Sequence, residues 1–164
     1  MKKHKLILGT AQFGLKYGIN NKTGILSVEK IFKILDYFYE NKIRILDTAE
    51  VYGNAHNLIG EYHKKNNSNV FDVITKIPKG FKGKLEKRVE KYLNDLNLDS
   101  LHSLFFHSFE DFKSNYNIFK VMIILKKNKL FKNIGVSVYN ENEINECLNY
   151  KDLDIIQMPF NLLD

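Results

Sequence analysis

Residues 44–53 read Arg-Ile-Leu-Asp-Thr-Ala-Glu-Val-Tyr-Gly, and this stretch indicates the fold more clearly than any other. A short apolar run ends at Asp47, and Tyr52 follows five residues later. Two further apolar runs end in the same way, one at Lys76 and the other at His107. Apolar runs of this length, separated by helical patterns, are typical of buried parallel strands. The stretch therefore predicts alternating strands and helices, with polar side chains where the strands end.

The same alternation continues along the chain and predicts an α/β fold. Strands are expected at residues 5–8, 43–47, 71–76, 103–107, 133–138 and 154–158, and helices at residues 28–41, 84–97, 118–128 and 141–148, with a further helix after Asn54. Units that recur about every 30 residues are typical of β–α–β repeats. A complete TIM (β/α)8 barrel needs ~250 residues. We therefore expect one domain, residues 1–164, that forms an incomplete barrel truncated after the sixth strand.

An open, doubly wound sheet is the alternative fold. Its dinucleotide-binding turn is a glycine-rich connection between the first strand and a helix. Residues 9–14, Gly-Thr-Ala-Gln-Phe-Gly, have too few glycines and are expected to lead into a long loop. The segment therefore argues against a Rossmann site.

Composition and charge exclude several classes of protein. The formal charge is +6, but the lysines are scattered among acidic and amide residues, which is typical of a solvated surface and not of a nucleic-acid site. No apolar run approaches the ~20 residues of a membrane span. The single cysteine, Cys147, is expected in the core and suits a reducing compartment. We expect a cytoplasmic protein with no nucleic-acid or membrane partner. No metal-ligand spacing relates the remaining histidines, which are expected at the surface or in loops: His4, His56, His63 and His102.

The polar groups at the predicted strand ends suit proton transfer. In a (β/α) barrel such groups meet at the carboxyl ends of the strands. A tyrosine with its ordinary pKa near ~10 is a weak acid at neutral pH. We expect the ammonium of Lys76 to lower the pKa of Tyr52, with Asp47 keeping that ammonium charged. His107 is expected to orient a substrate oxygen, although a satisfied core histidine is the alternative. No side chain supplies a hydride, so a cofactor must do so in a carbonyl reduction.

With this ordered series of side chains the chain resembles the aldo-keto reductases, over about six of the eight units of their barrel. The residues that match the family's catalytic tetrad are Asp47, Tyr52, Lys76 and His107. The resemblance implies an oxidoreductase that uses NADPH or NADH to reduce an aldehyde, ketone or sugar-like carbonyl, with Tyr52 as the proton donor. A non-catalytic binding or regulatory module and an inactive truncated fragment remain alternatives.

The resemblance also implies a set of cofactor-binding residues, which are Gly9, Thr10, Asp47, Ser137 and Gln157. In the family a serine–asparagine pair and a glutamine hydrogen-bond the nicotinamide carboxamide. Val138 stands at the asparagine position, and Asn140 is the candidate replacement. Tyr139 is either a ring that stacks at this site or a cover for the barrel rim. In the first loop, Lys16, Tyr17 and Asn20 are candidate contacts for a hydroxylated substrate.

The chain ends at Asp164, just past the sixth predicted strand. In the family, the loops after the last two strands hold the cofactor's phosphates. We expect either a fragment of a longer reductase or a chain that a second chain completes. The isolated chain is expected to bind NADPH at least ~100-fold more weakly than a full-length relative. Its first and sixth strands would be open edges, through which self-association is expected.

Overall fold

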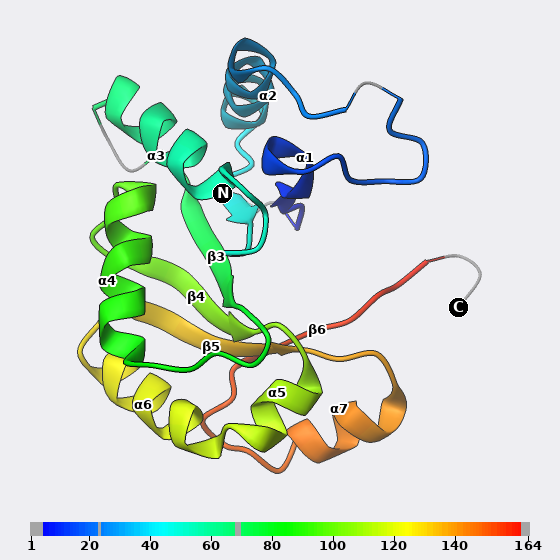
Figure 1. Cartoon of the computed structure of the whole chain (residues 1–164), viewed down its shortest axis with the longest axis vertical. Helices are drawn as coiled ribbons and strands as arrows, with labels where there is room; N and C mark the ends of the chain where they lie inside the picture. The colour runs from blue at the N-terminus through cyan, green and yellow to red at the C-terminus, as the bar shows by residue number, and fades with distance from the viewer. Residues whose placement is uncertain (1–4, 23, 68–69, 162–164) are drawn as a thin grey trace.

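Six parallel strands form one curved sheet, and helices connect them on its outer side (Figure 1). The computed structural model describes residues 5–22, 24–67 and 70–161. The strands are β1 (Leu8–Gly9), β2 (Ile45–Asp47), β3 (Asp72–Ile77), β4 (Leu101–Phe106), β5 (Phe131–Ser137) and β6 (Ile155–Gln157). They lie in the order β1-β2-β3-β4-β5-β6, each parallel to its neighbours. This is the sheet of a (β/α) barrel over six consecutive strands, so the predicted fold class is confirmed.

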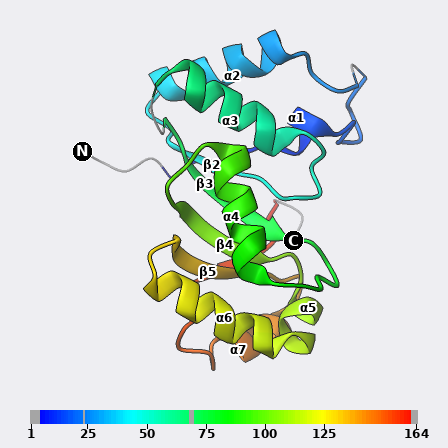
Figure 2. The ribbon, with the colours of Figure 1, turned by 60° about the vertical axis from the view of Figure 1, so that its left-hand side comes forward.

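The helices pack side by side along the outer face of the sheet (Figure 2). They are α1 (Ala11–Gly14), α2 (Val28–Glu40), α3 (Ala55–Lys65), α4 (Leu85–Leu96), α5 (Phe109–Ser114), α6 (Tyr116–Lys127) and α7 (Glu141–Cys147). One apolar core joins strand residues such as Leu46 and Leu104 to helix residues such as Ile31, Val89 and Met122, all fully buried. Burial of this apolar surface is the main force that holds the helices on the sheet.

Polar side chains define where several helices begin. Ser27 accepts a hydrogen bond from the backbone N–H of Lys30 at the start of α2, as its position predicts. Asn54 precedes α3, but its side chain makes no capping bond and instead accepts from Asn57 at 2.7 Å. Ser108 caps α5, a short helix that apolar periodicity did not predict.

Several boundaries differ from the expected ones. The first strand is Leu8–Gly9, later and shorter than residues 5–8. Residues 11–14 form the single-turn helix α1, which was not expected before the long loop, and this turn buries Phe13 in the core. β4 begins at Leu101, two residues earlier than expected, because Leu101 already pairs with Phe131 of β5.

His4, His56, His63 and His102 were expected at the surface or in loops, and for His56 and His63 that prediction is wrong. His102 lies in β4 and is partly exposed. His56 and His63 of α3 are buried, because this helix packs against α4 and His56 also hydrogen-bonds to Thr75 of β3. His63 Nδ1 donates to the carbonyl oxygen of Leu96 at 2.8 Å, and its Nε2 accepts from the N–H of Phe71 at 3.3 Å. His4 lies outside the described residues. Cys147 is buried in the core, as predicted.

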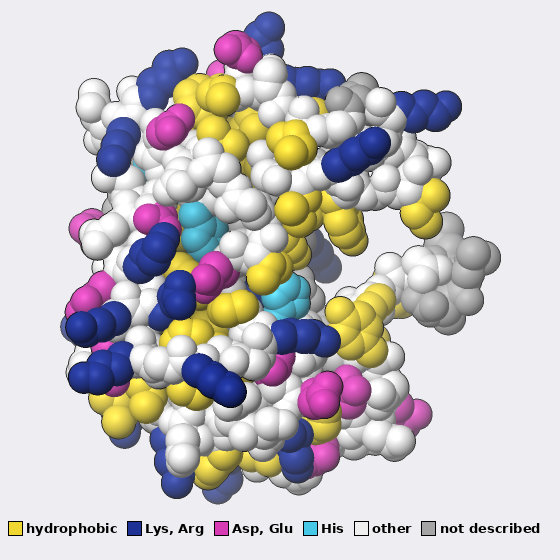
Figure 3. All heavy atoms as spheres, viewed as in Figure 1, with side chains coloured by type: hydrophobic (Ala, Val, Ile, Leu, Met, Phe, Trp, Pro, Cys, Tyr) yellow, Lys and Arg dark blue, Asp and Glu magenta, His cyan; other side chains and the backbone are white. Residues whose placement is uncertain are grey.

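The surface of the described chain is mixed in charge. Figure 3 shows lysine and arginine side chains spread over the viewed face and interspersed with acidic ones. Among the described helices, none has the length and apolar character to cross a membrane. β1 and β6 are the two edges of the sheet, and Leu6 and Ile7 beside β1 are exposed. Self-association through these edges stays a prediction.

Candidate active site

Three neighbouring strands bring the polar groups of the predicted site to one edge of the sheet. Asp47 is the last residue of β2, Lys76 lies one residue before the end of β3, and His107 directly follows β4. Tyr52 lies in the loop that leads from β2 to α3. The strands are parallel, so their carboxyl ends lie together, and the structure brings all four side chains to one region.

Lys76 and Asp47 form a buried ion pair at the centre of this region. The side chain of Lys76 is 3% exposed and that of Asp47 is 17% exposed. Lys76 Nζ donates to Asp47 Oδ1 and also to the carbonyl oxygen of Thr48, at 3.1 Å. A buried ammonium without partners is very costly, and these two acceptors offset that cost.

Tyr52 lies between the ion pair and His107. Lys76 Nζ is 5.8 Å from the centroid of the Tyr52 ring, and the Tyr52 and His107 rings meet edge to face with centroids 6.4 Å apart. Burial raises the pKa of Tyr52 above its ordinary value, and the charge of Asp47 raises it further. The expected lowering of this pKa is therefore wrong for the protein without ligands. The reason is burial of the phenol first and the negative charge of Asp47 second.

The surroundings of His107 favour its neutral imidazole form. Burial lowers its pKa, and the positive charges of Lys76 and Lys79 lower it further. A neutral imidazole can still donate one hydrogen bond to a carbonyl oxygen.

The residues predicted to bind the nicotinamide surround Asp47. Gln157 Nε2 donates to Asp47 Oδ2 at 3.1 Å, and Ser137 Oγ lies 3.3 Å from Gln157 Oε1. Ser137 and Gln157 are register partners in β5 and β6. Thr10 donates from both its N–H and its hydroxyl to the carbonyl oxygen of Asp47, at 2.9 and 3.1 Å. Gly9 is the register partner of Asp47, and a Cβ atom there would meet nothing within 4 Å.

Asn140, the candidate replacement for the asparagine that position 138 lacks, caps α7. Its Oδ1 accepts from the N–H of Glu143 at 3.0 Å, and its role toward a carboxamide stays a prediction. Val138 is fully buried. Tyr139 is largely exposed and lines a cavity of about 230 Å³ together with Ser137 and Gln157.

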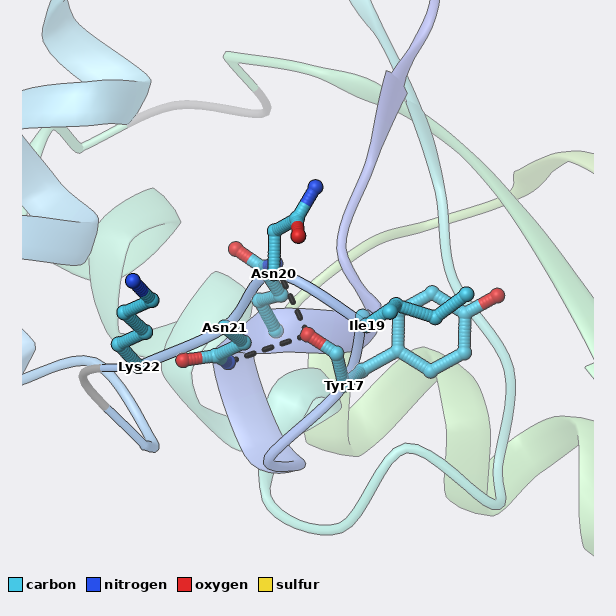
Figure 4. A pocket seen from close by; sticks show the side chains of 7 residues that line it. Tyr17, Ile19, Asn20, Asn21 and Lys22 are labelled. Carbon is cyan, nitrogen blue, oxygen red and sulfur yellow. Dashed lines mark hydrogen bonds between the residues drawn. The ribbon is translucent and has the colours of Figure 1, made fainter.

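The first loop forms a second, larger cavity of about 740 Å³, which Tyr17 and Asn20 line (Figure 4). Gln12 Nε2 and Asn21 Nδ2 both donate to the carbonyl oxygen of Tyr17, at 3.0 and 3.1 Å. These bonds fix the backbone of Tyr17. Tyr17 and Tyr139 add small further increases to the pKa of Tyr52, after burial and the charge of Asp47.

Sequence reasoning did not assign a role to Glu50, which lies between Asp47 and Tyr52. Its carboxylate contacts Arg88 and Tyr92 of α4. A charged residue between two predicted site residues could have indicated a role for Glu50, but nothing in the sequence identified its partners. No group of three potential metal ligands occurs in the part of the chain that the structure describes.

The fold and the site together define a class: α/β-barrel proteins with a polar site at the carboxyl ends of the strands. The sequence matches the model of the aldo/keto reductase family over residues 5–164, and the chain belongs to this family. A search of curated protein sequences found no match.

Solved structures of aldo-keto reductases have the same fold. A putative aldo-keto reductase from Pseudomonas aeruginosa superposes with a TM-score of 0.78 at 20% identity, over 96% of this chain and 64% of that one. An aldo-keto reductase from Klebsiella pneumoniae, solved with NADPH, gives 0.71 at 17% identity, over 94% of this chain and 54% of that one. One from Bombyx mori, solved with NADP, gives 0.71 at 20% identity, over 95% and 54%. This chain thus spans 54 to 64% of the length of these proteins.

Proposed function

We propose that this protein is an NAD(P)H-dependent oxidoreductase that reduces the carbonyl group of a small molecule. The observation that carries the proposal is the position of Asp47, which contacts Lys76 on one side and Gln157 on the other. One carboxylate thereby joins the groups suited to proton transfer to the groups suited to holding a nicotinamide. Family membership and the relatives solved with NADPH and NADP support the same activity.

In this proposal Tyr52 donates the proton. Its raised pKa keeps the phenol protonated throughout the neutral range, so Tyr52 carries the proton when substrate binds. An alkoxide is a much stronger base than a phenolate, so proton transfer from Tyr52 to a developing alkoxide is favourable. Lys76 then stabilises the phenolate that is left, because its ammonium lies near the ring. His107, which is neutral, donates a hydrogen bond to the carbonyl oxygen and orients it.

The residues around Asp47 fit a nicotinamide. A carboxamide presents one acceptor and two donor hydrogens, and Ser137 and Gln157 offer both complementary functions beside a cavity. The open space above Gly9 leaves room for a flat ring. When bound, the reduced nicotinamide supplies the hydride that no side chain can provide. Tyr17 and Asn20, at the larger cavity, are proposed to contact a hydroxylated, sugar-like substrate.

A titration with NADPH tests the cofactor site and separates a reductase from a non-catalytic module that binds no nicotinamide. Gln157→Met removes the amide while keeping the length of the side chain, and we expect it to weaken binding by about 10-fold, as the loss of one good hydrogen bond would. Asn149→Ala removes an exposed amide from the loop before β6 and should leave the affinity unchanged. Absence of NADPH binding by the wild type, or equal affinity in Gln157→Met, would contradict the proposal.

A further inference from the structure

The loop of residues 48–53 connects Asp47 to Tyr52, and its backbone is tied to β3. The N–H of Thr48 donates to the carbonyl oxygen of Ile74 at 2.9 Å, and the N–H of Glu50 donates to that of Lys76 at 3.3 Å. These bonds continue the pairing of β2 with β3 beyond the end of β2. They hold the first half of the loop, but the half that carries Tyr52 lies outside this ladder.

The side chain of Glu50 supplies a separate attachment, to helix α4. Its Oε1 accepts from Arg88 Nη1 at 2.9 Å, and its Oε2 accepts from the hydroxyl of Tyr92. Tyr92 is 1% exposed, whereas Glu50 and Arg88 are about one-third exposed or less. Burial first, and then the bond to Glu50, raise the pKa of Tyr92, so its hydroxyl stays a donor throughout the physiological range. A carboxylate that accepts two such bonds has little freedom to move.

The same cluster reaches the strand that carries Lys76. His56 packs edge to face on the ring of Tyr92, with centroids 5.3 Å apart. Its Nε2 lies 2.9 Å from the hydroxyl of Thr75, the residue before Lys76. The cluster therefore contacts the chain at Glu50, two residues before Tyr52, and at Thr75, next to Lys76.

We propose that Arg88 and Tyr92 are positioning residues of the active site, which hold the loop of residues 48–53 through Glu50 so that the ring of Tyr52 stays beside Lys76. Neither residue touches a reacting atom in this arrangement. The inference rests on the proposed role of Tyr52, but it concerns the placement of that side chain in the protein without ligands. It can therefore be measured without cofactor or turnover.

Tyr92→Phe is the decisive variant, because it removes one hydroxyl and keeps the ring and every charge. Its matched control is Tyr62→Phe. Tyr62 is 2% exposed, and its hydroxyl also donates to a carboxylate, that of Asp36 at 2.6 Å, on the side of α3 that faces α2. Each variant loses one hydrogen bond from a tyrosine hydroxyl to a carboxylate, but only Tyr92→Phe loosens the attachment of Glu50.

The pKa of Tyr52 is measured from its Cζ resonance in a protein with isotope-labelled tyrosine, titrated to alkaline pH. The resonance is assigned by its absence in Tyr52→Phe, and circular dichroism shows that the fold persists over the pH range. Burial is the main cause that raises the pKa of Tyr52. A loosened loop admits water, so Tyr92→Phe should lower this pKa by at least about half a unit. Hydrogen exchange at the N–H of Glu50 should quicken by about 10-fold in the same variant. Tyr62→Phe should change neither quantity.

Arg88→Met provides a second route if Tyr92→Phe does not fold, because the Arg88 side chain is 33% exposed and lies outside the core. Arg88→Met should lower the pKa of Tyr52, and Arg88→Lys should restore most of the wild-type value. Equal Tyr52 pKa values in Tyr92→Phe, Arg88→Met and Tyr62→Phe would overturn the inference. If Tyr52 responds as expected but the protein binds no NADPH, the positioning stands and the proposed function fails.

Discussion

Gln157 of β6 donates a hydrogen bond of 3.1 Å to Asp47 of β2, although β3, β4 and β5 lie between them in the sheet. Neighbouring strands are ~4.8 Å apart, so in a flat sheet these two strands would be separated by ~19 Å. The bond is therefore possible only because the sheet curls, and it joins β6 at one edge to β2, the strand next to the other edge. It also links the ion pair of Lys76 to the residues suited to a nicotinamide.

Breaking the buried ion pair should be costly. Lys76→Met leaves the carboxylate of Asp47 without its ammonium, and removal of one partner from a buried pair typically costs ~3–5 kcal/mol. Lys91→Met breaks an exposed pair with Asp95, and such pairs contribute at most ~1 kcal/mol. Urea unfolding of both variants measures the difference. Similar midpoints for the two would show that the Lys76 pair is not the buried contact described here.

Gly14 of α1 and Gly53 of the Tyr52 loop bring these two segments into direct backbone contact. A Cβ at position 14 would lie 1.9 Å from the carbonyl oxygen of Tyr52, so Gly14→Ala must displace one of the two segments. Gly9→Ala is the control, because a Cβ there meets nothing within 4 Å. We expect Gly14→Ala to lower the free energy of unfolding by ~1–3 kcal/mol, as overpacking does, and Gly9→Ala to leave it nearly unchanged. Equal melting temperatures for the two variants would contradict this packing.

Acid should destabilise the fold through a buried histidine. Burial lowers the pKa of His56 from its ordinary 6.5 to about 4. Between these values the unfolded chain binds a proton that the folded chain does not, so stability is full above pH ~6.5 and falls as the pH drops towards ~4. The full shift corresponds to a loss of ~3 kcal/mol.

Urea midpoints measured at neutral pH and near pH 4.5 test this prediction. His56→Gln keeps a polar partner for Thr75 but cannot take up the proton, so its stability should depend less steeply on pH than that of the wild type. His63, whose pKa burial also lowers, remains in both proteins and sets the residual slope. An identical slope in wild type and His56→Gln would exclude His56 as a source of acid sensitivity.

The parallel arrangement and the convergence of the site could be predicted from the sequence, because each depends on local patterns. Apolar runs that end at Asp47, Lys76 and His107 identify three strand ends, and parallel pairing then brings those ends together. Buried Lys76 required a charged partner, and Asp47 is that partner.

Properties that depend on packing could not be predicted in the same way. The pKa of Tyr52 is raised and not lowered, because burial outweighs an ammonium that is already paired. His56 and His63 are buried because α3 packs against α4, a contact that its polar composition did not indicate. Glu50 lies 38 positions before Arg88 and 42 positions before Tyr92 in the sequence. No local sequence pattern indicates a contact over such a separation.

The role of Tyr52 as proton donor is the central claim, and NADPH consumption with an aldehyde substrate tests it most directly. Tyr52→Phe keeps the ring that packs against His107 and removes only the hydroxyl. We predict that the wild-type protein oxidises NADPH in an aldehyde-dependent manner and that Tyr52→Phe does so at least ~10²-fold more slowly, the loss expected when a general acid is removed. Equal rates for the two proteins, or no aldehyde-dependent oxidation by the wild type, would contradict the account.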